Sequence, residues 1–468
     1  MSNPLFETFS IESPWIINEE KRFDANFYAK DSVASKVLIG ELEDRGIEIK
    51  NLGAFSKNIF FPGRFKRTLV PKNHGNPFLT PKEVFMFFPE AKKFIIDYSN
   101  ELDIKENWIL ITRSGTIGRC IISTKLLNKF VLSDDLIRII PKKSWGYIYA
   151  YLNTWIGKTF LTKDQYGSTV KHIEPQHVEN IPIPIIPDLE KNINQTIKKV
   201  QNLREDAQNL ISMAENVFYS ELKLKKIDED IIRYYGTENG KLINCFIIKS
   251  SELNMRLDAP YYEPVVQKIK QDLFESDIKI EKLSNLVKDI FIPPRFKRPY
   301  VKDTDEGTLF LSGTDLIEFT PLNAKYLWNK FNKIENYKVH EGYILISARG
   351  TVGRPYYVTN IMNGSTASDN IIRCITKPEK ILPSYLTAYL LTTHASHQIQ
   401  ALKAGSVQDL LQPIHINDIY VPVPSMESQR KIGNLILEAY TKKDQANNIE
   451  EEAIKCFEET LLKLSKTK

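Results

Sequence analysis

The sequence has few of the features that mark redox, zinc-binding or membrane proteins. Its 468 residues contain only four cysteines. No two of them lie at the spacing of a CxxC motif or a zinc knuckle, so we expect reduced thiols. No apolar run approaches the roughly 20 residues of a membrane helix, and the first residues lack the basic and apolar regions of a secretory signal. These absences favour a cytoplasmic protein without disulfides.

Catalytic motifs are also missing. The sequence has no GxSxG elbow, no HExxH pair, no glycine-rich dinucleotide fingerprint and no Asn/Asp-Pro-Pro-aromatic tetrad of adenine-N6 methyltransferases. His394 and His397 lie three residues apart in an expected helix, but no cysteine or carboxylate cluster near them completes a metal site. Glu48 and Lys50 have the ExK spacing of some nucleases, a triplet that chance often produces. We therefore expect no catalytic residue, no metal and no directly bound cofactor.

What the sequence does contain is a long internal repeat. Residues 59–67 read IFFPGRFKR and residues 290–298 read IFIPPRFKR, with seven of nine positions identical. Further pairs return in the same order at offsets of 235 to 238 residues: ILITRSGTIGR (109–119) with ILISARGTVGR (344–354), SDDLIR (133–138) with SDNIIR (368–373), and GSTVKHIEPQHVENIPIP (167–184) with GSVQDLLQPIHINDIYVP (405–422). The chain is thus a tandem duplication, with a unit far longer than a solenoid repeat.

Each repeat combines a β-rich part with one long helix. Short β-like runs precede an amphipathic helix, which we expect over 147–161 and again over 384–402. The IPIPIIP run at 181–187 must be extended, because alternating prolines exclude a helix. Apolar residues then recur every seven positions, which is typical of a coiled coil. The first helix has Ile193, Val200, Ala207 and Ala214 with Thr196, Leu203, Leu210 and Val217; the second has Ile432, Ala439, Ala446 and Ala453 with Leu435, Ile449 and Cys456, where Lys442 interrupts.

These patterns predict an α+β fold: two tandem mixed α/β domains joined by two long helices that form an antiparallel coiled coil, with a pseudo-twofold axis. We expect the first domain at 1–188, the first long helix at 189–224, a linker and the second domain at 225–426, and the second long helix at 427–468. A helix of about 34 residues is about 51 Å long, which matches about 15 base pairs of DNA. Two similar basic domains at that spacing suit two half-sites on one duplex.

The RFKR peptide is the main candidate for contact with DNA. The net charge of the whole chain is only +5, so a basic surface must come from local clustering. A single basic loop is more often a solvated charge run, but the close match between the two copies favours DNA contact. A peptide that is the same in both domains suits a grip on the DNA backbone better than the reading of bases. The candidate contacts are Arg64, Lys66 and Arg67 in the first copy, and Arg295, Lys297 and Arg298 in the second.

Two further segments carry candidate contacts. In the glycine-containing turn of residues 109–119, Arg113 aligns with Ala348 and Ser114 aligns with Arg349. Positions that differ between the copies are where the domains would read different bases, although ordinary drift would look the same. In residues 167–172 the hydroxyl and ammonium groups could bind phosphates, or the hydroxyls could cap a helix. The candidates there are Ser168, Thr169 and Lys171.

The repeats, their order and their long helices resemble the specificity subunit of type I restriction–modification systems, over nearly the whole chain. The resemblance implies two target recognition domains, each binding one half of an asymmetric, bipartite DNA site, with the helices setting the gap. It implies a non-catalytic subunit whose partners are double-stranded DNA, two DNA methyltransferase subunits and restriction/translocase subunits. S-adenosylmethionine, ATP and magnesium would then bind to those partners rather than to this chain.

The sequence departs from the family pattern in two places, and other functions stay open. Residues 405–422 lack the KHIEP part of the late motif, and the two RFKR loops are more alike than recognition domains of the family usually are. One alternative is a specificity subunit of a type II-like or other phage-defence complex. Another is a duplicated protein-binding scaffold, in which the RFKR loops would hold acidic peptides. A third is a nuclease that uses Glu48.

Overall fold

The computed structural model describes residues 30–163, 172–227, 245–253, 257–301, 305–319, 325–404 and 409–466. The chain divides into two compact units. Unit 1 comprises Met1–Phe85, Pro89–Glu205 and Ala446–Lys468, and unit 2 comprises Met86–Phe88 and Asp206–Gln445. The sheets of the two units match strand for strand, so the duplication seen in the sequence is also a duplication of structure.

The first sheet of each unit is four-stranded and antiparallel. Its order is β2-β9-β6-β7 in unit 1 and β12-β19-β16-β17 in unit 2. The ILIT and ILIS segments form inner strands whose residues are all buried, as expected of a short, mostly apolar run. The strands are β2 (Ser56–Phe60), β6 (Ile109–Thr112), β7 (Cys120–Ile122) and β9 (Leu136–Pro141), matched by β12 (Val287–Phe291), β16 (Ile344–Ser347), β17 (Pro355–Tyr357) and β19 (Ile371–Thr376).

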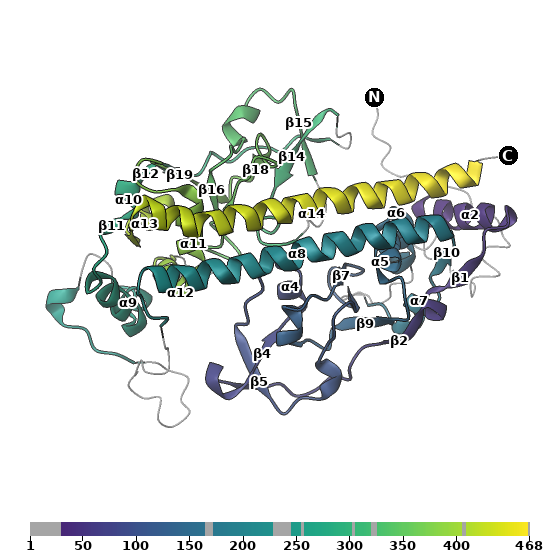
Figure 1. The fold of residues 1–468 in the computed structure, drawn as a ribbon, viewed down its shortest axis with the longest axis horizontal. Helices are drawn as coiled ribbons and strands as arrows, with labels where there is room; N and C mark the ends of the chain where they lie inside the picture. The colour runs from purple at the N-terminus through teal and green to yellow at the C-terminus, as the bar shows by residue number, and fades with distance from the viewer. Residues whose placement is uncertain are drawn as a thin grey trace. The chain divides into compact units, whose positions relative to one another are not determined.

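The second sheet has the order β3-β5-β4-β8 in unit 1, where β4 and β5 are labelled in Figure 1, and β13-β15-β14-β18 in unit 2. Its last pairing, β4 with β8 or β14 with β18, is parallel. The RFKR peptide carries the chain from the first sheet to the second sheet. Further along the chain, the first residues of the SDDLIR motif carry it back from the second sheet to the first. The strands are β3 (Thr68–Val70), β4 (Asn76–Leu79), β5 (Lys93–Ile96) and β8 (Val131–Leu132), matched by β13 (Tyr300–Val301), β14 (Gly307–Leu311), β15 (Lys325–Trp328) and β18 (Thr366–Ala367).

Part of the proline-rich run is an extended strand, and the prediction that this run contains no central strand is confirmed. Strand β10 (Pro182–Pro184) pairs antiparallel with β1 (Ile49–Asn51), and β20 (Tyr420–Pro422) pairs in the same way with β11 (Ile280–Lys282). Prolines lack an N–H, so they are tolerated at such an edge. The short helices are α3 (Leu52–Phe55), α4 (Pro81–Val84), α7 (Pro175–Glu179), α9 (Pro264–Phe274), α10 (Leu283–Leu286) and α13 (Pro413–Ile416).

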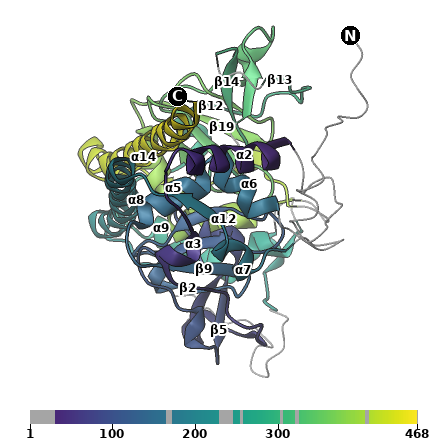
Figure 2. The same cartoon turned by 90° about the vertical axis from the view of Figure 1, so that its right-hand side faces the viewer.

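The prediction of a single amphipathic helix in each repeat is wrong, because each of the two regions forms two helices. Residues 147–161 fall in α5 (Trp145–Asn153) and α6 (Trp155–Lys163), and residues 384–402 fall in α11 (Pro383–Leu391) and α12 (Thr393–Ala401). Thr154 and Thr392 break them: each is extended, and each hydroxyl accepts an N–H from the first turn of the next helix. In unit 1, α2 (Lys30–Asp44) packs on α6, and both are labelled in Figure 2.

The two long helices are α8 (Pro187–Glu221), teal in Figure 1, and α14 (Met426–Lys466), yellow. The first heptad set predicted in each helix is buried, but the second set is displaced by one residue. Positions 196, 203, 210 and 217 and positions 435, 442, 449 and 456 are partly or fully exposed. The buried positions are Ile197, Arg204, Ile211 and Phe218 in α8, and Ile436, Lys443, Glu450 and Phe457 in α14.

The displacement has a packing cause. Each helix packs on the short helices of a domain as well as on the other long helix, and this needs a wider buried stripe than a two-stranded seam. The Phe457 ring lies 4.7 Å from the Tyr147 ring in unit 1, and the Phe218 ring lies 5.7 Å from the Tyr389 ring in unit 2. These ring contacts hold the buried faces of both helices against the short helices of the domains.

Within unit 2 the long helices run antiparallel. Glu221, at the end of α8, pairs with Lys431 near the start of α14 at 2.6 Å. Asp206, earlier in α8, pairs with Lys442, later in α14, at 3.3 Å. The predicted antiparallel pairing is therefore confirmed within this unit, as is the α+β class with tandem domains joined by helices. The pseudo-twofold axis stays a prediction. No helix in the described ranges combines the length and apolar character that crossing a membrane requires.

Candidate nucleic-acid interface

The basic loop of each unit joins the two sheets. It leaves the end of β2 and reaches β3 in unit 1, and it leaves β12 and reaches β13 in unit 2, without regular secondary structure between. Pro62 and Pro293 are buried at the start of the loops. A chain fixed at both ends by strands and at its start by a buried proline presents its side chains in a defined direction.

Side chains of the loop alternate between the protein and the solvent. Phe65 packs against the buried cluster of the second sheet, and the Phe296 ring stacks on the Tyr337 ring at 3.7 Å. The cations on either side of each phenylalanine are exposed and make no ion pair or side-chain hydrogen bond with the residues that the structure describes. Exposed cations on a held loop suit the binding of phosphate groups. These cations are Arg64, Lys66, Arg295 and Lys297.

The last arginine of each loop is paired with a carboxylate of its own unit, although the Arg67 side chain is still 41% exposed and that of Arg298 is 33% exposed. Arg67 Nη2 donates to Asp134 Oδ1 at 2.6 Å, and Arg298 Nη2 donates to the Asp369 carboxylate. Each guanidinium also lies over an aromatic ring of the second sheet, at 5.2 Å in unit 1 and 5.4 Å in unit 2. The RFKR peptide therefore contains two outward cations and one cation that is engaged in an internal ion pair.

The acidic partners lie on turns that buried arginines hold in place. Arg138 donates to the carbonyls of Leu132 and Ser133, and Arg373 donates to the equivalent carbonyls of unit 2. Both side chains are fully buried, and burial lowers the pKa of each to about 10, so both remain charged at neutral pH. Sequence reasoning used these motifs only as landmarks of the repeat. An arginine kept inside an apolar strand in both copies is the signal that could have identified the turn.

Arg113 is held inside unit 1 rather than presented to solvent. Its side chain is 13% exposed, and its Nη2 donates to Glu174 Oε1 at 2.6 Å. Its Nη1 lies 4.0 Å from Asp135 Oδ1, and its guanidinium lies 4.1 Å from the centroid of the Phe61 ring, at the start of the basic loop. Arg113 thus supports the loop through Phe61 and neutralises two carboxylates.

Unit 2 lacks this whole cluster. Matching backbone hydrogen bonds to the carbonyls of Arg113 and Ala348 show that the two positions are equivalent. The cation is lost together with both of its acidic partners and the ring beneath it, so this difference between the copies has a structural cause. The replacements in unit 2 are Ala348 for Arg113, Asn370 for Asp135, Gln412 for Glu174 and Ile292 for Phe61.

At the next position the cation is in unit 2 instead of unit 1, because Ser114 aligns with Arg349. The Ser114 hydroxyl donates to the Asp135 carboxylate, whereas the matching Arg349 is half-buried and has no ion pair or side-chain hydrogen bond within the described ranges. Arg349 is therefore the uncommitted cation among the positions at which the two turns differ. The remaining candidates, Ser168, Thr169 and Lys171, lie outside the described residues.

The other polar candidates have structural partners. In the parts of the chain that the structure describes, no group of three or more His, Cys, Asp or Glu side chains could hold a metal ion. His394 is buried, and its Nδ1 lies 3.0 Å from the Tyr219 hydroxyl. Glu48 and Lys50 pair with each other at 2.7 Å on the surface of unit 1.

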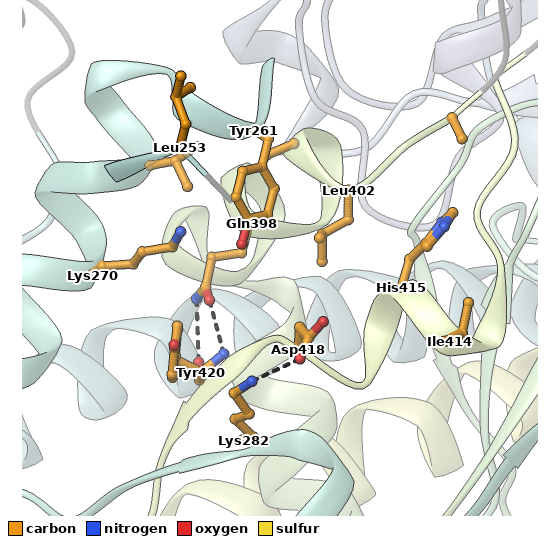
Figure 3. Close-up of a pocket in the computed structure, with 13 residues that line it drawn as sticks. Leu253, Tyr261, Lys270, Lys282, Gln398, Leu402, Ile414, His415, Asp418 and Tyr420 are labelled. Atoms are coloured by element: carbon orange, nitrogen blue, oxygen red, sulfur yellow. Dashed lines mark hydrogen bonds and ion pairs between the residues drawn. The ribbon is translucent and has the colours of Figure 1, made fainter. Parts of the chain in front are cut away.

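Unit 2 also contains a pocket of about 1040 Å³ whose lining includes no residue of the basic loop (Figure 3). The Gln398 side chain bonds the backbone of Tyr420, and Lys282 pairs with Asp418 at 2.9 Å. These internal bonds engage much of the polar lining. Two of its lining residues, Leu253 and Ala404, adjoin residues outside the described ranges.

Comparison with known proteins places these features in a family. The family model for the type I restriction modification DNA specificity domain matches residues 48–212 and 297–455, one match in each repeat. The MjaVIII type I restriction enzyme specificity subunit of Methanocaldococcus jannaschii is 23% identical over 345 residues, which cover 73% of this chain and 74% of the relative.

Two solved structures also resemble the chain. The S subunit of the type I restriction–modification system from M. genitalium has a TM-score of 0.35 at 12% identity, over 90% of this chain and 96% of that one. The HsdS subunit from Thermoanaerobacter tengcongensis has a TM-score of 0.28 at 11% identity, with the same coverage of 90% and 96%. The family matches together span well over half of the sequence, and they fall on both repeats. This chain therefore belongs to the family defined by the type I restriction modification DNA specificity domain.

Proposed function

We propose that the chain is the non-catalytic DNA sequence-recognition subunit of a type I restriction–modification complex. The observation that carries this proposal is the pair of exposed cations at the same place in both domains, Arg64 with Lys66 and Arg295 with Lys297. Two copies of one cationic surface suit a bipartite site, in which each domain binds one half. The family match to both repeats supports the same division.

Within each domain we assign different tasks to different side chains. The exposed cations of the loop grip phosphates, which fixes the position of the domain on the duplex without reading sequence. Arg349, at the turn where the two copies differ, is the candidate for base contact in unit 2, because a guanidinium can bind the O6 and N7 atoms of guanine together. Ser168, Thr169 and Lys171 are further candidate contacts of the first domain.

The proposal includes partners. In the cytoplasm the chain would bind double-stranded DNA, dock two methyltransferase subunits on its long helices and assemble with restriction/translocase subunits. Those subunits would bind S-adenosylmethionine, ATP and magnesium. The relative from M. jannaschii is named as the specificity subunit of a restriction enzyme, which supports a partnership of this kind.

Adenine-methylation mapping tests the function directly. Genomic DNA is compared between cells that carry this gene and cells that lack it, with the neighbouring methyltransferase gene present in both. We expect methylated adenines that depend on this gene and lie in two short half-sites separated by a fixed gap. Methylation of one continuous site, or methylation that does not depend on this gene, would contradict a bipartite specificity subunit.

A further inference from the structure

The two domains share a contact that the DNA-binding assignment does not by itself explain. In each unit the last arginine of the basic loop pairs with an aspartate on a turn of the chain. This turn directly precedes β9 in unit 1 and β19 in unit 2. We propose that Arg67 and Arg298 are positioning residues of the DNA interface: their ion pairs with Asp134 and Asp369 hold the basic loops so that the outward cations face the phosphates. This inference rests on the proposed function and assigns roles within the same site.

The contact lies where it can control the loop. Residues 61–67 carry the chain from the first sheet to the second, and residues 133–135 carry it from the second sheet back to the first. The Arg67–Asp134 pair joins these two crossings, and Arg138 ties the second crossing to the buried interior through backbone carbonyls. The loop is thus linked to a buried anchor only one residue after Lys66.

The same bonds recur in unit 2, down to the serine beside the aspartate. The Ser133 hydroxyl accepts from Arg67 Nη2 at 3.4 Å and from the Asp135 amide at 3.2 Å. In unit 2 the matching distances around Ser368 are 3.3 Å and 3.2 Å. The nearby Arg113 cluster occurs in unit 1 but not in unit 2, whereas this contact is present in both. Its retention supports a task that both domains need.

The negative charge of Asp134 makes the inference testable, because the two explanations predict opposite changes in DNA affinity when that charge is removed. A carboxylate beside a cationic loop weakens the attraction of that loop for DNA. If Asp134 has no positioning role, removing its charge should tighten binding, and it should do so still more if the freed Arg67 then reaches a phosphate. If Asp134 positions the loop through Arg67, removing its charge should weaken binding although the protein becomes more positive.

The experiment measures binding of the full-length chain to a duplex of arbitrary sequence, by fluorescence anisotropy over a series of KCl concentrations. We expect Asp134→Asn to weaken binding about threefold or more, and the exchanged pair Arg67→Asp with Asp134→Arg to recover most of the loss. Arg64→Ala should weaken binding and lower the salt slope by about 0.9. In the Asp134→Asn background the loss caused by Arg64→Ala should shrink by a factor of about two or more, because the two residues act together.

Matched variants separate positioning from charge and from folding. Glu106→Gln removes the same charge from an exposed carboxylate outside the contact and should leave binding unchanged or slightly tighter. Asp369→Asn should reproduce the effect of Asp134→Asn through unit 2. If Asp134→Asn does not fold, Arg67→Lys keeps the charge but loses the planar donor pair. It should weaken binding and lower the salt slope, because the outward cations then contact fewer phosphates.

Two results would overturn the inference. One is an Asp134→Asn protein that binds as tightly as the wild type or more tightly. The other is an Arg64→Ala effect of equal size in both backgrounds. Failure of the proposed function looks different, because the wild-type chain itself would then bind the duplex weakly and without a salt slope.

Discussion

At the scale of single residues, arginine has three distinct uses in this protein. Arg138 is buried and bonds backbone carbonyls, Arg67 is paired with a carboxylate on a turn, and Arg64 is exposed without such a partner in the described residues. The sequence alone predicts a cluster of positive charge, since RFKR occurs twice. It does not reveal which member of the cluster is free, because the partner of Arg67 lies 67 residues further along the chain.

The Arg113 cluster shows a second reason why residue roles escaped sequence reasoning. A position that differs between two copies can mark sequence reading or a local structural exchange. Here Arg113 changes together with the two carboxylates that contact it, Asp135 and Glu174. The correlated change is present in the sequence. It can be recognised only when contacts show which residues belong together.

His394 predicts a pH dependence for the stability of unit 2. Its ring is buried, and burial lowers its pKa to about 4. An unfolded histidine has a pKa of about 6.5, so between these values the unfolded chain binds a proton that the folded chain does not. Stability is therefore complete above about pH 6.5 and falls as the pH drops toward 4. The His394 contribution lost between pH 7.5 and pH 5 is about 2 kcal/mol.

Urea unfolding at the two pH values measures this loss. His394→Gln should unfold with a smaller difference between pH 7.5 and pH 5 than the wild type. His340→Gln, which replaces an exposed histidine of unit 2 outside this helix, is the matched control. Equal pH dependence in the wild type and in His394→Gln would assign the titration to other groups.

At the scale of elements, the strands and the first heptad set were predictable, and the helix breaks were not. Mostly apolar runs such as ILIT can be placed from the sequence because burial is the favourable environment for their apolar side chains. Thr154 and Thr392 end one helix and cap the next, but threonine is also common inside strands and helices. The second stripe of α8 and α14 was misplaced because buried Arg204 and Glu450 do not look like core residues.

The Arg204–Glu450 pair is a structural element of unit 1 and predicts a large stability effect. The two side chains are 3% exposed each, and the guanidinium donates to both carboxylate oxygens, at 2.9 Å and 2.7 Å. Tyr149 donates its hydroxyl to the same carboxylate at 2.8 Å, so the pair joins α8, α14 and α5. Glu450→Gln removes the carboxylate that neutralises the buried Arg204 charge and should lower the free energy of unfolding by about 3–5 kcal/mol.

Denaturant unfolding of the full chain checks this effect, with the double variant as the control. Replacing both partners by methionine removes the buried charges together, so Arg204→Met with Glu450→Met should recover most of the stability lost in Glu450→Gln. Should the double variant be as unstable as the single one, the loss would come from packing around the pair rather than from an unpaired charge.

At the scale of the whole molecule, each long helix is shared between the units. Helix α8 passes from unit 1 to unit 2 after Glu205, and α14 passes back after Gln445. Two continuous helices between two DNA-binding domains provide a physical basis for a fixed gap between half-sites. Inserting one heptad into each helix at these boundaries leaves the residues that pack within each unit in place. Seven residues add about 10 Å of helix and rotate it by only about 20°, which corresponds to about 3 base pairs of DNA.

The heptad insertion therefore predicts a change in site architecture without a change in the bases read. Methylation mapping of cells that carry the doubly inserted chain should show the same two half-sites with a gap longer by about 3 base pairs. Insertion into α8 alone should abolish methylation. Only one of the two antiparallel helices would then be lengthened, so the contacts between α8 and α14 could not form in both units at once. If the doubly inserted chain is active and its gap is unchanged, the helices do not measure the distance between half-sites. The gap would then be set by the partner subunits.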